Sequence, residues 1–163
     1  MAGLFGAEEH RIGPWNHQVL VFEGYSNVLA VPVRARIGNS ITTSPTGKNH
    51  TAKWKLAVGD SVRAVRGPEP WMPRDRYVIT LGFSFHCPSH GNQPLDVENF
   101  IKPTLDALAA GLFSPTDTDL TTLVRWGYDD SNFTHFFIHR LPDALTQDEE
   151  GAALFICDRT VGA

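Results

Sequence analysis

Short stretches of alternating apolar and polar residues predict β-strands in the first half of the chain. The clearest runs from Tyr77 to His86, where every second residue through Phe85 is large and apolar. Side chains of a strand point alternately to its two faces, so this period places one face in a core. Two shorter strands are expected at 19–23 and 28–36, separated by a turn.

A period of three to four residues predicts two helices. The first is expected over Thr51–Arg66. Its apolar face comprises Trp54, Val58, Val62 and Val65. A loop rich in Gly, Ser, Thr, Pro and Asn is expected before it, over residues 37–50. The second helix is expected over Val97–Ala110. Pro103 lacks the N–H that an interior helical residue donates, so we expect a kink or a late helix start there.

Two further apolar stretches, 120–128 and 133–141, flank a polar turn and predict a β-hairpin. Together the elements predict an α+β fold, in which helices pack on a small mixed or antiparallel sheet. A chain of 163 residues is long enough to bury one core in a single domain. That core is expected within about 19–141, which leaves 1–15 and 142–163 peripheral.

Composition narrows the class of protein. No apolar run approaches the roughly 18 residues of a membrane-spanning helix. The first fifteen residues lack the apolar segment of a secretory signal. The two cysteines do not make a disulfide framework. We therefore expect a cytoplasmic protein without a membrane partner.

Charge is distributed unevenly along the chain, whose net charge is −4. The segment from Arg34 to Arg76 contains nine Lys or Arg and three Asp or Glu, whereas twelve acids and four bases follow from Asp96 onward. The basic segment is either a polyanion-binding surface beside a carboxylate site or a solvated face, and charge alone leaves both interpretations open. The residues that would contact DNA phosphates are Arg34, Arg36, Lys48, Lys53, Lys55, Arg63 and Arg66.

Carboxylates gather around the start of the second predicted helix. Asp96 is placed to cap it, where free N–H groups and the helix dipole favour an ionised carboxylate. Glu98 lies one turn before Lys102, so the two can pair. Asp119 is expected to open the next strand and to return to the helix start. Oxygen donors without His or Cys favour Mg²⁺ or Mn²⁺ over zinc. Taken singly, each acid is equally explained by capping, solvation or a turn.

The order of these residues resembles that of the RusA-like Holliday-junction resolvases. From Asp96 the chain reads D-x-E-N-x-x-K-P-x-x-D-A-L, and the acidic turn 117–119 follows. The family pattern is D-x-D-N-x-x-K-x-x-x-D-A-L, a short loop, and two adjacent acids before a strand. Glu98 therefore stands where the family usually has Asp. The third acid is matched best by Asp119, with Asp117 as the other choice.

The resemblance implies an α+β homodimer that cleaves four-way DNA junctions with Mg²⁺. Carried over by position, the metal-binding residues are Asp96, Glu98 and Asp119, and Lys102 completes the catalytic set. Two alternatives stay open. One is a branched-DNA binding protein that has lost cleavage, and the other is a phosphohydrolase that acts on no nucleic acid.

Overall fold

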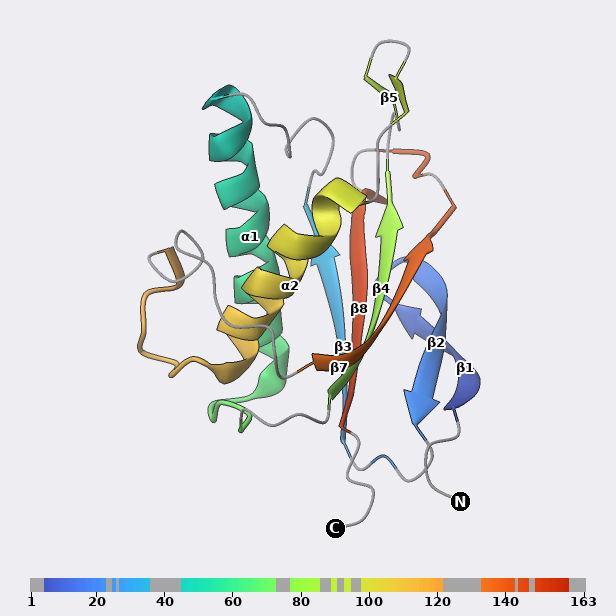
Figure 1. Cartoon of the computed structure of the whole chain (residues 1–163), viewed down its shortest axis with the longest axis vertical. Helices are drawn as coiled ribbons and strands as arrows, with labels where there is room; N and C mark the ends of the chain where they lie inside the picture. Colours follow the sequence, from blue (N-terminus) through green and yellow to red (C-terminus); the bar gives the residue numbers. More distant parts are fainter. Residues whose placement is uncertain are drawn as a thin grey trace.

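The structure is a computed structural model that describes residues 5–22, 25, 27–35, 45–72, 77–85, 89–90, 93–94, 98–121, 133–142, 144–146 and 149–158. These residues form an α+β fold in three layers (Figure 1). Two helices cover one face of a four-stranded sheet, and a two-stranded sheet covers the other face. No helix in the described ranges is long and apolar enough to cross a membrane.

The elements follow one another in the order β1 (Phe5–Ile12), β2 (Trp15–Phe22), β3 (Asn27–Arg34), α1 (Pro45–Arg66), β4 (Tyr77–Ser84), β5 (Ser89–His90), β6 (Gln93–Pro94), α2 (Glu98–Phe113), β7 (Phe133–Arg140) and β8 (Gly151–Asp158). β1 and β2 form an antiparallel hairpin, and β5 and β6 form a very short one. The central sheet has the order β3-β8-β4-β7. Its first three strands are antiparallel, whereas β7 runs parallel to β4.

The central strands are buried on both faces because a layer packs on each side. All eight residues of β4 and of β8 are buried. In β4, Ile79, Leu81 and Phe83 belong to the core shared with the helices. Val78 belongs to the smaller core under the β1–β2 hairpin. The period-2 pattern predicted for this strand thus separates the two cores.

Helices α1 and α2 approach each other closely at two glycines. A Cβ added at Gly111 of α2 would lie 2.8 Å from the carbonyl oxygen of Gly59 and 2.9 Å from Cβ of Val62, both in α1. A buried hydrogen bond, 2.9 Å long, also joins the helices, from Nε1 of Trp54 to Oγ1 of Thr104. Both the close contact and this bond fix how α2 lies on α1.

Helix α1 confirms the first predicted helix but begins earlier. Residues 45–50, expected in the loop, are helical, since Pro45 fits a first helical turn in which its missing N–H leaves no bond unmade. Three residues of the predicted apolar face are buried, but Val65 is 45% exposed near the helix end. The helix ends before Gly67, whose φ of 93° favours glycine.

Helix α2 confirms the second predicted helix and runs through Pro103. Of the two effects expected from Pro103, the late start is wrong, because the helix already begins at Glu98, and the kink stays a prediction. Residues 104–114 behind the proline are all buried. Burial of this apolar segment outweighs the single backbone hydrogen bond that Pro103 cannot make.

The predicted hairpin over 120–128 and 133–141 is confirmed only in its second strand. Leu120 and Thr121 are helical, so the first strand does not begin where it was expected, and residues 122–132 lie outside the described ranges. β7 confirms the second strand. Its described partner is β4, in parallel. The contact between β4 and β7 therefore joins two segments separated by the whole of α2.

The two segments that were predicted to be peripheral each contribute a strand to the fold. β8, from within 142–163, occupies the middle of the sheet between β3 and β4. β1, from within 1–15, forms half of the hairpin, and Ile12 is buried. The strands predicted at 19–23 and 28–36 are confirmed within β2 and β3, which belong to different sheets.

Candidate functional site

The start of α2 carries the first part of the predicted site. Asp96 lies outside the described residues, and Glu98 is the first residue of α2, described in its backbone alone. Lys102 lies one turn farther along the same helix. In the described ranges, no group of three or more His, Cys, Asp or Glu is arranged to hold a metal ion. Convergence of Asp96 and Glu98 on a metal stays a prediction.

Lys102 forms an ion pair with Asp106 on the next turn of α2. The Nζ atom lies 2.9 Å from Oδ1 of Asp106. The atoms are close but not aligned as a hydrogen bond, so the contact is electrostatic. The side chain of Lys102 is 68% exposed, whereas that of Asp106 is 12% exposed. The i,i+4 spacing is visible in the sequence and was the signal that Asp106 adjoins the candidate lysine.

Asp119 does not open a strand. Its Oδ1 accepts a hydrogen bond of 3.0 Å from the backbone N–H of Thr121, at the start of a helical turn. Asp117, two residues earlier, is likewise exposed. An exposed carboxylate suits a hard cation, so the chemistry of either acid is compatible with the predicted metal. The location of these two acids, however, does not agree with a metal site shared with Glu98.

Asp119 is held near the far end of α2, away from Glu98. Arg63 binds both the Thr118 carbonyl, at 2.6 Å, and Oγ of Ser114, at 2.7 Å, so these two residues are neighbours. Ser114 follows the 16-residue helix α2, which is about 24 Å long at 1.5 Å per residue. That separation exceeds the reach of two carboxylates that share one ion. The prediction that Asp119 joins Glu98 within one chain is therefore wrong, and Asp117 does not replace it.

Arg66 is the main reason for this placement. Its Nη1 donates to the carbonyl oxygens of Gly111 at 2.7 Å, Leu112 at 3.1 Å and Ser114 at 2.7 Å. Its Nη2 donates to Oγ1 of Thr116 at 2.8 Å. The last carbonyls of a helix lack partners within it, and a positive charge suits that end of the dipole. Arg66 thus caps α2 from the neighbouring helix.

Arg63 extends the contact to the segment after α2. Besides Ser114 and Thr118, it donates to the carbonyl oxygen of Pro115 at 2.7 Å. We call Arg63 and Arg66 the arginine clamp. Burial first, and then the charge of Arg63, lower the pKa of Arg66 from its ordinary value, although a guanidinium stays charged. Both were predicted to bind DNA phosphates. For Arg66, which is buried, that role is wrong, and the guanidinium of Arg63 is already bound within the protein.

Of the other predicted phosphate contacts, the described side chains of Arg34, Lys53 and Lys55 lie toward the opposite end of the fold. Arg34 and Lys53 have exposed side chains, and Lys55 is half-buried. Arg36 lies outside the described residues, and Lys48 is described in its backbone alone. Arg34 ends β3 and Ser84 ends β4, and both pair with Gly151. The first turns of α1 and of α2 lie at this same end of the sheet (Figure 1).

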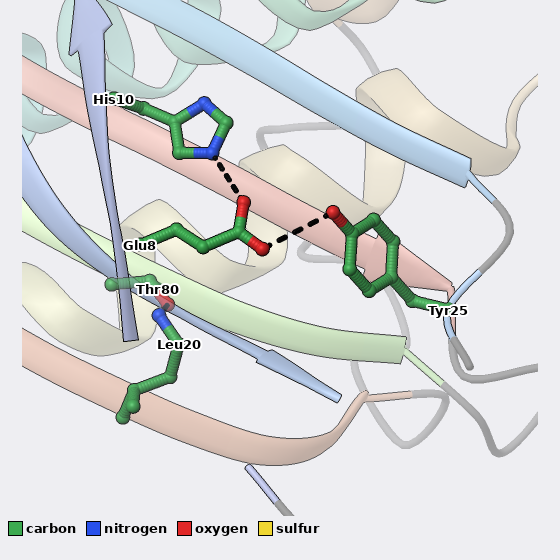
Figure 2. A network of polar contacts seen from close by, with 5 residues as sticks. All are labelled: Glu8, His10, Leu20, Tyr25 and Thr80. Atoms are coloured by element: carbon green, nitrogen blue, oxygen red, sulfur yellow. Dashed lines mark hydrogen bonds and ion pairs between the residues drawn. The ribbon is translucent and has the colours of Figure 1, made fainter. Parts of the chain in front are cut away.

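A separate polar group lies under the β1–β2 hairpin (Figure 2). Glu8 is 3.0 Å from Nε2 of His10 and accepts a hydrogen bond of 3.3 Å from the Tyr25 hydroxyl. The backbone N–H of Leu20 donates to Oγ1 of Thr80 at 3.3 Å, which ties β2 to β4. Figure 2 shows the Glu8 carboxylate between His10 and Tyr25, and Leu20 beside Thr80.

His17 is buried in the same layer without a hydrogen bond. It is 1% exposed, and neither ring nitrogen has a hydrogen-bond partner in the described parts of the chain. Its ring meets that of His139 edge to face, with centroids 5.4 Å apart. Burial first, and then His139, lower the pKa of His17 to about 4. Sequence reasoning missed this residue, although His17 alternates with the apolar Trp15 and Val19.

A cleft of about 290 Å³ opens beside the hairpin turn. Its walls are formed by Pro14, Trp15, Asn16, Ser84, Pro142, Ala144, Leu145 and Glu149. Among the predicted catalytic and phosphate-binding residues whose side chains the structure describes, none lines it. The cleft and the start of α2 are thus different regions of the surface.

Comparison with known proteins adds no assignment. No protein-family model matches the chain, and no curated protein sequence matches it.

Proposed function

We propose that this protein is a metal-dependent endonuclease that cleaves four-way DNA junctions as a cytoplasmic homodimer. One observation carries the proposal. Glu98 and Lys102, in the order that resembles the RusA-like resolvases, occupy the first turns of α2 at the end of the sheet that also bears Arg34 and the first turns of α1 (Figure 1). An acidic residue, a lysine and basic residues at one end suit phosphodiester hydrolysis on DNA.

Each group has a chemical role in this proposal. Asp96 and Glu98 hold Mg²⁺ or Mn²⁺, which when bound polarises the phosphate and activates water. Lys102 places its exposed ammonium against the negative charge that develops on the phosphate or the leaving oxygen. Arg34, Lys53 and Lys55 contact phosphates without reading sequence. A two-fold dimer presents one site to each of the two symmetric strands of a junction.

The test is a nicking assay on a synthetic four-way junction. Asp96→Asn keeps the size and capping ability of the side chain but removes a metal-binding charge. We expect nicking with Mg²⁺ or Mn²⁺ to fall by about 100-fold or more, while gel-shift binding persists. Asp119→Asn serves as the discriminating variant. Because the arginine clamp holds Asp119 away from Glu98, its nicking rate should stay within about twofold of wild type.

The outcomes separate the alternatives. Nicking by Asp96→Asn at the wild-type rate contradicts the metal site. A wild-type protein that shifts junctions but never nicks them is the branched-DNA binding protein, for which Glu98 in place of Asp is the first cause to test. A protein that neither shifts nor nicks junctions is not a junction endonuclease, and a phosphohydrolase that acts on no nucleic acid then becomes the working hypothesis.

A further inference from the structure

Asp106 is an unusual residue for its place in α2. It is the one charged residue of the sequence between Lys102 and Asp117. Its neighbours in the helix, residues 104–114, are all buried, and Asp106 itself is 8% exposed. A carboxylate seldom lies at such a depth unless it is paired. In the described ranges, Asp106 forms an ion pair with Lys102.

Helix stability does not account for this pair. Asp is a poor residue for a helix interior, and Asp106 lies too far from the first turn of α2 to be stabilised by the helix dipole. The favourable order of an i,i+4 pair puts the acid before the base, whereas here Lys102 precedes Asp106. An exposed lysine in such a pair adds little to folding. We therefore look for a function of this ion pair other than stabilising the fold.

The contact instead restrains Lys102. A lysine that is 68% exposed has four side-chain torsions and samples many conformers in solution. Asp106 is held by the packed face of α2, and its Oδ1 lies 2.9 Å from the ammonium. A nearly buried carboxylate therefore fixes a solvent-exposed ammonium on the first half of α2.

We propose that Asp106 is a positioning residue that holds the ammonium of Lys102 where the phosphate is to bind. This inference rests on the proposed function, since it concerns how Lys102 acts in cleavage. Asp106 touches neither DNA nor metal. It acts through Lys102 by reducing the conformers that the ammonium must abandon before the transition state.

The test is a double-mutant cycle measured on junction nicking. Asp106→Asn keeps the shape of the side chain and removes its charge. We expect kcat to fall about tenfold, with KM and metal-free junction binding within about twofold of wild type. In a Lys102→Ala background, Asp106→Asn should change kcat by less than about twofold. Asp106→Glu, which keeps the carboxylate, should retain more activity than Asp106→Asn.

Two controls keep the result interpretable. Asp60→Asn removes the same charge from an exposed position on α1, and should leave kcat unchanged. Urea unfolding of each variant shows whether a loss of kcat follows a loss of fold.

Additive effects of Asp106→Asn and Lys102→Ala, or equal losses in Asp106→Asn and Asp60→Asn, overturn the inference and leave the proposed function standing. Should Asp106→Asn not fold, Asp106→Glu with the Lys102→Ala background decides in the same way. A wild type that never nicks junctions overturns both the proposed function and this role of Asp106.

Discussion

The two faces of the central sheet are covered by layers of opposite character. On the helix face, aromatic and aliphatic side chains form the larger core, and a buried hydrogen bond from Trp54 to Thr104 joins its two helices. On the hairpin face, the core is smaller and buries His17, which has no hydrogen-bond partner among the residues that the structure describes. The helix layer holds α2 in place against α1. In the hairpin layer, the buried His17 makes the free energy of unfolding depend on pH.

The difference matters for where a function can be placed. Helix α2 is held on α1 near its C-terminal end by contacts that cannot shift easily, namely helix backbone against helix backbone and the arginine clamp. The hairpin meets the sheet through side chains and a few hydrogen bonds. The predictions below test whether the two faces differ as described.

The largest expected effect is a loss of stability in acid, and it belongs to the hairpin face. His17 is neutral in the folded protein, with a pKa of about 4 against 6.5 for the ordinary side chain. The unfolded chain binds a proton between these values and the folded chain does not. The stabilisation is thus complete above pH 6.5 and is lost as the pH falls toward 4, by about 3 kcal/mol in the free energy of unfolding.

Urea unfolding from pH 7.5 to 4 measures this loss. His17→Phe keeps a ring in the site and should remove most of the dependence. The titratable groups that face His17 are His139 from β7 and His10 from β1, its partner across the hairpin. His10→Gln is the matched control and should keep the dependence. An unchanged acid profile in His17→Phe would place its origin elsewhere.

The second effect concerns the helix face. In Gly111→Ala, the new Cβ would meet the Gly59 carbonyl oxygen at 2.8 Å, and backbone atoms of a packed helix cannot move aside. We expect the free energy of unfolding to drop by about 2 kcal/mol, after the gain in helix propensity is counted. The drop should be equal at pH 7.5 and pH 5. A variant as stable as wild type would mean that the helices separate at little cost.

The smallest effect comes from the matching substitution on the hairpin face. In Gly82→Ala, the new Cβ would lie 2.8 Å from ring atoms of His17 and 3.0 Å from Cδ1 of Leu141. Side chains can yield, so we expect a loss of about 1 kcal/mol at pH 7.5. Displacement of the His17 ring should also reduce the loss of stability in acid. A cost as large as that of Gly111→Ala would show that the two faces are equally rigid.

Periodicity predicted the elements that have one buried face or a clear alternation. α1 and α2 followed from their apolar spacing, and β4 from alternate large residues. β8 did not, because a strand buried on both faces reads as a continuous apolar run without a period. Residues 151–158 therefore looked like a tail.

For the candidate site too, some positions could be predicted from local sequence patterns and others could not. The place of Glu98 and Lys102 on one helix followed from local spacing. The place of Asp119 did not, because it depends on side-chain contacts from Arg63 and Arg66 to backbone carbonyls about fifty residues later. Local pattern contains no information on such contacts. Basic residues near a helix end were accordingly mistaken for a DNA-binding surface.

Because β8 lies between β3 and β4, the central sheet cannot form completely during synthesis until β8 has been made. Leu154 lies opposite Val31 on one side and Leu81 on the other. Until β8 has left the ribosome, β3 and β4 both lack their shared neighbour and expose unpaired backbone groups. Contacts of such long sequence separation form slowly, and open strand edges pair readily with other chains. A nascent chain of this protein therefore exposes two strand edges that are open to wrong pairing until residues 151–158 have emerged.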